Sequence, residues 1–507
     1  METTLLPDKY RNQIHGVLHC YDRVIVAGSL QPFCYAHGMT NYLYQQQIRI
    51  FDYTQFAEPL RDEIRQNAER IATENGLTIE FIRKKNFRKE DRIRAILKQR
   101  GEPPGLVHIF SAMEACPSYQ PWHDKNTGKT YLKATTSKCL HYYFYFIDAE
   151  LGLCFLRVPT WCPFTLEFYF NGHAQLAARL KERGIAFEQR DNAFVNIADF
   201  EAANQLAQDL NIEHLHAKLD ELARQYCPAA ITLQHQYYWS IRQAEYATDV
   251  VFKRPAVLQA IFSALIYVLA VCVQPDDIAT FLGQKLHGNY QGEIGNRFNK
   301  RQLGRRVKHA MGPVSIKTYD KFGLILRIET TVNAVSFFRH YREVIHRNGT
   351  RETKWAKMKK SLYSLAPLQE VLLAANQRYL AYLSEIETPE LGVSLLNRLS
   401  QTQADNQHSY KGFNLLAEED AAVCRALLRG EFAISGLTRK ALRALFPDKS
   451  DGQLSRLLKR LRVHGLIKKI GQHYKYYLTK LGRSVAALAL KLRELVIIPA
   501  LANVVTA

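Results

Sequence analysis

The 507-residue sequence lacks the short motifs that mark several large classes of enzyme. It contains no phosphate-binding glycine loop, no dinucleotide-binding fingerprint, no nucleophile elbow and no HExxH zinc motif. Its nine cysteines form no CxxC pair and no paired spacing, which is typical of reduced, structural thiols in a cytoplasm. We therefore expect a cytoplasmic protein with no nucleotide or redox cofactor and no disulfide framework.

The sequence also has little that would direct it to a membrane. Its first residues, METTLLPDKYRNQ, have neither the apolar core of a signal peptide nor the Arg- and Ser-rich pattern of a transit peptide. The one long apolar run, residues 256–273, just reaches the lower limit for spanning a bilayer, but Pro255 and the polar QPDD bound it. A helix that covers a β-sheet has the same pattern, so we expect a buried helix and no membrane partner.

Acidic residues are too few to balance the basic ones. The chain has 68 Lys and Arg against 48 Asp and Glu, which gives a formal net charge of +20 at pH 7. A positive field of this size attracts polyanions, so nucleic acid is the first partner to consider.

The apolar pattern predicts a multidomain α/β (α+β) protein with mixed sheets and covering helices. Residues 1–230 alternate strand-like and helix-like segments and are expected to form an N-terminal α/β domain. Residues 231–345 read as a β-α-β-hairpin domain with a basic loop. Residues 346–410 are charged and read as a helical connector, and residues 411–507 read as a C-terminal winged helix-turn-helix.

Several shorter segments carry these domain predictions. Strands are predicted at 238–252 and 278–283, and a hairpin at 314–332 that turns near Phe322 and Gly323. Residues 121–138 are polar and read as a turn-rich stretch.

The hairpin at 314–332 carries a row of polar residues on one face. Strand alternation places Lys317, Tyr319 and Lys321 on one side of its first strand. In the second strand the same side receives Arg327 and Glu329. Polar faces of antiparallel sheets are usually solvated, so the row is either a wet surface or a site.

Carboxylates in the strand at 238–252 complete a candidate metal site if that strand lies beside the hairpin. Alternation puts Glu245 and Asp249 on one face, and Glu329 and Asp320 are the further candidate ligands. Carboxylate oxygens suit Mg²⁺ or Mn²⁺. Beside a tyrosine hydroxyl and lysines suited to phosphate, such an ion could cut a phosphodiester.

A strongly basic loop lies between Gly283 and Gly312. Basic runs are usually only solvated, but this one adjoins the hairpin in a basic chain, so we expect contacts to nucleic-acid phosphates. The residues concerned are Arg297, Lys300, Arg301, Arg305, Arg306 and Lys308.

The segments IATFLGQK, SIKTYDKFG and LRIETTV follow one another in an order that resembles plasmid rolling-circle replication initiators and related phage replication and relaxase-like proteins. The resemblance covers about a fifth of the chain. It implies that Tyr319 attacks a DNA phosphate and that Glu245, Asp249 and Glu329 hold the metal ion. Lys317, Lys321 and Arg327 would stabilise charge.

The sequence departs from these families because it has no His-hydrophobic-His pair on a convincing strand. The one such triplet, His214-Leu215-His216, has helical periodicity and reads as a surface helix. His173 follows Asn171-Gly172 at a predicted helix start and reads as a capping or surface residue.

The last hundred residues predict helices at 418–430, 437–446 and 450–467, with Ser450 as an N-cap, then a short hairpin and a closing helix. The run LSRLLKRLRVHGLIKKIGQHYKYYLTKLGRSV resembles the winged-helix domain of multiple-antibiotic-resistance-type transcription regulators. Its third helix and wing would meet DNA through Gln453, Arg456, Lys459, Arg460, Arg462, His473 and Lys475.

Two alternatives for this C-terminal part stay open. A winged helix can also serve protein contact, and the apolar closing helix could pair with a second copy in a homodimer.

Taken together, these patterns predict a nucleic-acid-binding protein that processes DNA, as strand-nicking, replication-initiator or transposase- and relaxase-like proteins of mobile elements do. One alternative is a non-enzymatic winged-helix regulator whose N-terminal part senses a ligand or partner. Another is an RNA-binding component of a ribonucleoprotein, in which the basic loop and the aromatic-rich strands grip structured RNA.

Overall fold

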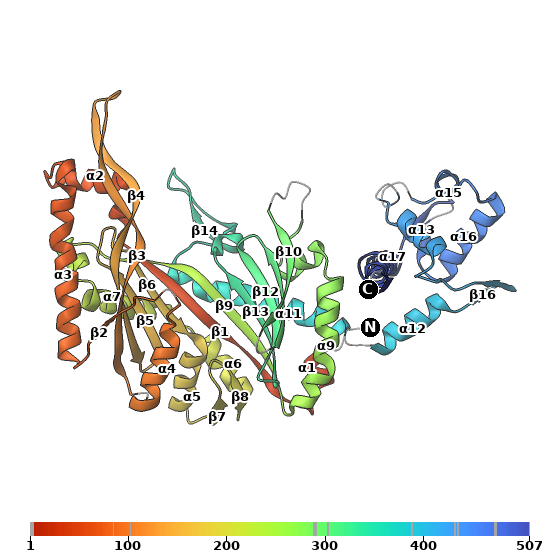
Figure 1. Ribbon diagram of the computed structural model, residues 1–507, viewed down its shortest axis with the longest axis horizontal. Coiled ribbons are helices and arrows are strands. Elements are labelled where there is room, and N and C mark those ends of the chain that lie inside the picture. Colours follow the sequence, from red (N-terminus) through yellow and green to blue (C-terminus); the bar gives the residue numbers. More distant parts are fainter. Residues whose placement is uncertain are drawn as a thin grey trace. The chain divides into compact units, whose positions relative to one another are not determined.

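The computed structural model describes residues 5–505 apart from 85, 102, 287–291, 302–303, 387–388, 430–431, 433–435 and 471–473. The chain divides into two compact units, Met1–Glu385 and Ile386–Ala507 (Figure 1). Each unit has its own core and is described by itself.

Unit 1 is built on one eleven-stranded sheet, so the mixed α/β class predicted from the sequence is confirmed. Only the short β2–β3 pair is parallel among the paired strands described in this sheet. In sheet order the strands are β10 (Ile294–Arg301), β11 (Gly304–Met311), β12 (Val314–Lys321), β13 (Ile325–Val332), β9 (Tyr238–Phe252), β1 (Ile14–Ser29), β6 (Leu166–Asn171), β5 (Gly152–Pro159), β4 (Lys129–Asp148), β3 (Gly105–Asp124) and β2 (Ile79–Phe81).

Strands from the two predicted N-terminal parts therefore lie in the same sheet. They meet where β1 pairs with β9, and β9 pairs on its other side with β13. The helices of this unit are α1 (Leu6–Lys9), α2 (Ala36–Gln45), α3 (Tyr53–Glu74), α4 (Lys89–Arg100), α5 (Gly172–Glu182), α6 (Phe200–Gln208), α7 (Ile212–Tyr226), α8 (Ala229–Thr232), α9 (Pro255–Cys272), α10 (Pro275–Phe281) and α11 (Leu365–Ile386).

The apolar face of the central strands is covered by α9, α10 and α11. The run at 256–273 is a helix that contacts β9, β10 and β11, so the prediction of a sheet-covering helix is confirmed. Asn376 of α11 is fully buried, donates to the carbonyl of Tyr246 and accepts from the Thr330 hydroxyl. Satisfied polar contacts of this kind fix one register of helix on sheet.

No single helix among the described residues is long and apolar enough to cross a bilayer. One pair bent by 117°, Pro255–Ala270 with Pro275–Phe281, reaches the required length and apolar composition together.

The opposite face of the same strands is covered in part by α5, α6 and the small hairpin β7 (Phe187–Gln189) with β8 (Phe194–Ile197). Leu18 and Cys20 of β1 pack there against Leu176, Leu180 and Phe194. Beyond this cluster the face becomes polar, and the turn of the β7–β8 hairpin places residues 190–193 over it. The polar row of the 314–332 hairpin is therefore largely buried. The sequence alone left open whether this row was a solvated surface or a site.

Four segments differ from the sequence-based expectation. Residues 121–138 belong to the long β3–β4 hairpin, and residues 278–283 belong mainly to α10, whose N-terminus carries Pro275 and a capping box from Gln274. The basic loop contains the hairpin β10–β11, and a second hairpin joins β14 (Arg339–Ile345), which precedes the expected connector, to β15 (Arg351–Lys357) within it. The ribbons at 121–138 and 339–357 bury little surface and so show no clear apolar alternation, which hid them in the sequence.

Unit 2 contains the order of elements expected for its C-terminal part. Three helices, α13 (Glu418–Leu427), α15 (Arg439–Leu445) and α16 (Asp451–Val463), precede a two-stranded hairpin, β18 (Ile467–Lys469) with β19 (Tyr476–Leu478), and then α17 (Lys480–Leu492). Ser450 caps α16 as predicted, and Leu454, Leu458 and Leu461 pack in the core. The remaining elements are α12 (Pro389–Ser400), β16 (Gln403–Asp405), β17 (His408–Tyr410), a π-helix (Arg493–Ile497) and α18 (Ile498–Val505).

Candidate functional site

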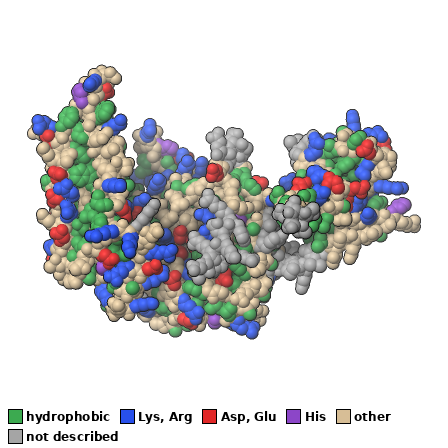
Figure 2. Space-filling model, in the orientation of Figure 1, with side chains coloured by type: hydrophobic (Ala, Val, Ile, Leu, Met, Phe, Trp, Pro, Cys, Tyr) green, Lys and Arg blue, Asp and Glu red, His purple; other side chains and the backbone are tan. Residues whose placement is uncertain are grey.

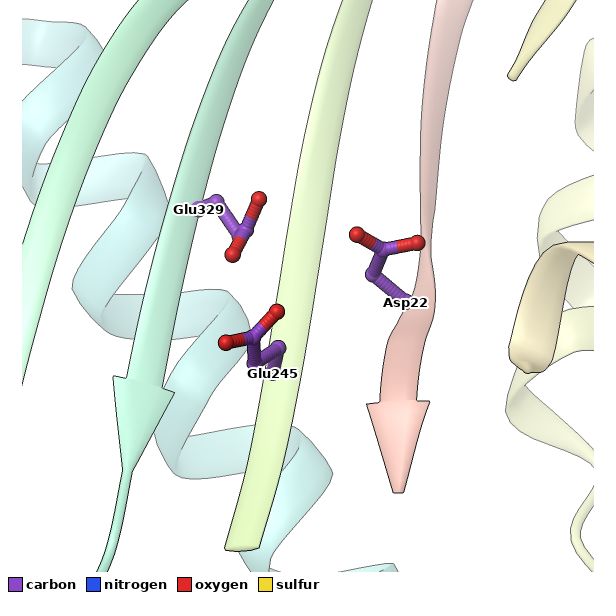
Figure 3. A group of neighbouring side chains, drawn as sticks. All are labelled: Asp22, Glu245 and Glu329. Atoms are coloured by element: carbon purple, nitrogen blue, oxygen red, sulfur yellow. The ribbon is translucent and has the colours of Figure 1, made fainter. Parts of the chain in front are cut away.

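Three carboxylates from three adjacent strands meet on the polar face of the large sheet. Asp22 lies on β1, Glu245 on β9 and Glu329 on β13, and one oxygen of each lies within 4.8 Å of the others. Their side chains point toward one another across the β9 strand (Figure 3). Three carboxylate oxygens at this separation form a ligand set suited to a hard divalent cation.

Strand register explains how two of these residues come together. β9 pairs with β13 so that Glu245 lies opposite Thr331, and Ala247 lies opposite Glu329. Glu245 and Glu329 are therefore diagonal neighbours on one face, which confirms the prediction that the strand at 238–252 lies beside the hairpin.

Asp22 lies on β1 at the point where the β1–β9 register shifts between Tyr21 and Arg23, which leaves it without an opposite residue. Leu18 and Cys20 lie opposite Asp249 and Ala247, so ordinary alternation along β1 places Asp22 on the face of Glu245. Asp22 was missed because its strand was expected in a separate N-terminal domain, and no local pattern shows that β1 pairs with β9.

Glu329 has one oxygen that is hydrogen-bonded and one that is not. The Tyr319 hydroxyl donates to Oε2 at 2.7 Å, and the Lys317 ammonium forms an ion pair with Oε1. Within the described residues Oε1 accepts no hydrogen bond of good geometry, although Glu329 is only 1% exposed. A buried carboxylate oxygen in this state fits a place for a further cation.

Burial and the nearby charge of Glu329 raise the pKa of Glu245 to about 7. The Lys317 ammonium, 3.9 Å from Glu245 Oε1, acts in the opposite direction but offsets only part of this effect. Burial, together with Glu329, also raises the pKa of the Tyr319 phenol well above its usual value. Glu245 is therefore the least compensated carboxylate of the three.

Asp249 takes part in a separate, saturated ion pair. Its carboxylate accepts from Arg327 Nε at 2.7 Å and from Nη2 at 2.6 Å, and both side chains are almost completely buried. Although burial alone would raise the pKa of Asp249, the Arg327 guanidinium and His173 hold it well below its usual range.

The same guanidinium connects the ion pair to Asp22. Arg327 Nη1 lies 3.4 Å from Asp22 Oδ2, and Nη2 donates to the backbone carbonyl of Asn192 at 2.8 Å. The Asn192 side chain in turn donates to Asp22 Oδ1 at 2.7 Å. Asn192, in the turn between β7 and β8, therefore connects this hairpin both to the Arg327 guanidinium and to Asp22, one of the candidate ligands.

The site opens to one side of the sheet. Asp22 and Glu245 line an open cavity of about 1170 Å³, together with Arg23, Asn171 and Asn192. Tyr319 is partly exposed. A ligand larger than a water molecule can therefore approach Asp22 and Glu245, whereas Glu329 lies deeper, at 1% exposure.

The other residues predicted for this site lie at its edge. Lys321 donates to the Asn192 carbonyl at 3.1 Å, and burial lowers its pKa to about 8. Asp320 accepts from the Gly323 amide in the hairpin turn and lies outside the group of three carboxylates. Arg327 has no exposed surface, so it cannot contact an incoming phosphate directly.

His173 is fully buried, in contrast to the capping or surface position expected for it. Asn171 caps α5 instead, and its side-chain oxygen accepts from the His173 amide. His173 Nε2 accepts from Arg327 at 3.0 Å, and Nδ1 lies 3.2 Å from Asp22. His214 and His216 lie on the helix α7, as predicted.

The predicted nucleic-acid contacts of the basic loop are only partly described. The side chains of Arg297, Lys300, Arg301 and Arg305 lie outside the described residues. Arg306 and Lys308 lie on β11, where they pair with Tyr319 and Lys317 of β12 in the strand register.

In unit 2 the predicted DNA-contacting residues divide into two groups. Arg460 donates to Asp420, to Lys411 O and to Gly412 O, so it holds the unit's own fold, and Lys459 pairs with Asp405. Gln453 completes the capping box of α16. Arg456, Arg462 and Lys475 are exposed, and His473 lies outside the described residues.

Comparisons with known proteins give little further information. No family model and no curated protein matches the sequence. Among solved structures, the chain is similar to a rolling circle replication initiator protein from Geobacillus stearothermophilus, at 9% sequence identity and a TM-score of 0.19, with 63% of this chain and 75% of that chain covered. The functional argument therefore rests on the geometry of the site.

Replacing Arg327 with Met should destabilise unit 1 severely. Asp249 and Asp22 would stay buried without their cation, which costs about 3–5 kcal/mol. The control is Arg242→Met, because Arg242 is 58% exposed and its surface pair with Glu167 contributes at most about 1 kcal/mol. Urea unfolding at pH 7 measures both variants, and equal losses would contradict the proposed dependence on the buried pair.

Replacing Glu245 with Gln should stabilise the metal-free protein at pH 8, by about 1–3 kcal/mol. The raised pKa of Glu245 means that folding stability falls as the pH rises from the unfolded value of about 4.5 toward 7, and Gln removes this loss. At pH 5 the gain should nearly disappear. Thermal unfolding in EDTA tests this, with Glu74→Gln on exposed α3 as the control; a net loss of stability at pH 8 would show that Glu245 serves mainly as a partner of Lys317.

Proposed function

We propose that this protein binds DNA and cuts one strand at the carboxylate site in a reaction that requires Mg²⁺ or Mn²⁺, as replication-initiator, transposase- and relaxase-like proteins do. The observation that carries the proposal is the meeting of Asp22, Glu245 and Glu329 within 4.8 Å, with a tyrosine hydroxyl bonded to one of them. Glu245 is the least compensated of the three, because its nearest cation is the Lys317 ammonium at 3.9 Å, which also pairs with Glu329.

The donor set fits a hard cation. All three ligands would be carboxylate oxygens, Asp22 being oriented by Asn192 and Asn171. When bound, the ion would neutralise charge on the phosphate and lower the pKa of the nearby phenol. Zinc is less suitable because no His or Cys belongs to the group.

Tyr319 is the proposed nucleophile. Its phenolic oxygen would form a bond to phosphorus while the bond from phosphorus to one deoxyribose oxygen breaks, which leaves a covalent phosphotyrosine. The phenolic proton can pass to Glu329, which already accepts its hydrogen bond. The released deoxyribose oxygen takes a proton from solvent.

The cations of the site would serve two different purposes. Lys317 forms ion pairs with both Glu245 and Glu329 and would contribute positive charge where a phosphate meets these carboxylates. Lys321, which bonds to Asn192, and Arg327, which is fully buried, would instead fix the positions of the acidic groups.

Unit 2 would supply recognition of duplex DNA. Its helices and hairpin follow the order of a winged helix, with α16 as the helix that enters the major groove. On the face drawn in Figure 2, Lys and Arg side chains are spread over both units and mixed with Asp and Glu. The exposed Arg456, Arg462 and Lys475 are therefore the side chains we assign to DNA contact.

Incubation with supercoiled and single-stranded DNA and Mn²⁺ should give nicked product joined to the protein, and Tyr319→Phe should abolish both. Glu329→Gln should lose Mn²⁺ binding by at least about tenfold, as the removal of one ligand normally does. Asp320→Asn is the matched control, because Asp320 lies on the neighbouring strand β12 but outside the carboxylate group. Unchanged product from the Tyr319 variant would refute the nucleophile, and no Mn²⁺ binding by the native protein would refute the site.

Arg456→Ala should weaken duplex binding and lower the slope of log affinity against log salt by about 1. The measurement is fluorescence anisotropy of a labelled duplex with the full-length protein in EDTA. Arg70→Ala on α3 removes an exposed charge from unit 1 and should leave the slope unchanged. Equal slopes for all three proteins would favour a winged helix that contacts protein.

A further inference from the structure

The hairpin β14–β15 is a two-stranded ribbon separate from the large sheet. Its base is anchored by Phe338 and Met358, each only 2% exposed, and the Met358 amide donates to the Phe338 carbonyl. The rest of the ribbon extends from unit 1 (Figure 1). The sequence-based interpretation treated this segment as part of a helical connector, and the proposed function does not use it.

An aromatic pair lies on the outer face of the ribbon. Tyr341 and Trp355 are directly opposite each other, and their ring centroids are 6.3 Å apart. Tyr341 is 63% exposed and Trp355 66% exposed. Exposed aromatic rings forfeit the energy of burial, so a pair of them on a ribbon indicates that a ligand covers them.

Positive charge lies on one side of the aromatic pair. Arg339–Lys357 is the next pair on this face, two positions along the ladder. On the other side Glu343 lies opposite Thr353, with Arg351 3.7 Å from the Glu343 carboxylate. Residues 339–360 contain eight Lys and Arg against two Glu, a net charge of +6. A partner that offers flat apolar rings and negative charge together matches this surface.

We propose that the outer face of β14–β15 binds single-stranded DNA by stacking unpaired bases on Tyr341 and Trp355, while Arg339 and Lys357 contact the phosphates. Stacking on aromatic side chains beside a basic track is how proteins hold single strands without reading their sequence. In a duplex the faces of the bases are covered by their neighbours, so the rings select the unpaired form.

This inference rests on the proposed function only for the purpose of single-strand binding, because a strand that is to be cut must be held in an accessible form. Binding itself is measured without metal, so the two proposals can fail separately.

The test is fluorescence anisotropy of a labelled oligothymidine of about 20 nucleotides, with the full-length protein in EDTA. Tyr341→Ala and Trp355→Ala should each weaken binding about 10- to 100-fold, whereas Trp355→Phe should retain most of the affinity because it can still stack. Phe51→Ala removes an aromatic ring that is 62% exposed in the short helix Ile50–Asp52 and should have no effect.

The charge contacts have their own readout. Replacing both Arg339 and Lys357 with Gln should lower the salt slope for single-stranded DNA by about 1.4, since each phosphate contact contributes about 0.7. Affinity for a duplex of the same length should be the same for Trp355→Ala as for the native protein.

Three results would overturn the inference. They are unchanged single-strand affinity in both alanine variants, tighter ribbon-dependent binding of the matching RNA, or a change in oligomeric state by light scattering with no change in DNA affinity. If nicking is absent while the ribbon variants still lose affinity, only the proposed function fails, and the reverse pattern defeats only this inference.

Discussion

The buried pair between Arg327 and Asp249 is the interaction on which the site depends. Two hydrogen bonds join β13 to β9 at this point. Nη2 of the same guanidinium also contacts His173 and Asn192, and Nη1 lies 3.4 Å from Asp22. Because an unpaired charge is so costly in this interior, the guanidinium fixes the bulged part of β1 and the β7–β8 turn relative to the central strands. Asp22 can then stay near Glu245 and Glu329 despite their like charge.

The acidic residues differ in how completely their charge is compensated. This difference distinguishes Asp249, which stabilises the fold, from Glu245, which we assign to the candidate metal site. Asp249 is saturated by hydrogen bonds, and its pKa is lowered. Glu245 has only a distant ammonium and a long contact to Thr331, and its pKa is raised to about 7. A protein that needed these side chains only for stability would do better with neutral ones at this position. Their retention in an open cavity is understandable if a cation completes the group.

Strand alternation was enough to predict much of the polar face, and the structure shows where that reasoning stops. Glu245, Asp249, Arg327 and Glu329 share a face because their strands are regular and adjacent. Asp22 was not predicted, since nothing in the local sequence shows that β1, expected in a separate domain, pairs with β9. The ribbons at 121–138 and 339–357 were missed because solvent on both sides removes the apolar period that reveals a strand. The helix α10 was mistaken for a strand, although Gln274, Pro275 and the two aspartates that follow are the usual signals of a helix start.

Under the proposed function, the distribution of charge sets an order of events. Three carboxylates at the proposed cutting site repel a phosphate as long as no cation lies between them, so the ion would bind before DNA settles there. DNA would first be held by basic surfaces outside the acidic group. The β14–β15 ribbon, whose residues 339–357 carry a net charge of +4, and the exposed arginines of α16 meet this requirement. Glu245 makes the step sensitive to pH: below about 7 it is protonated and competes poorly for a cation, so the site becomes fully available only as that proton leaves.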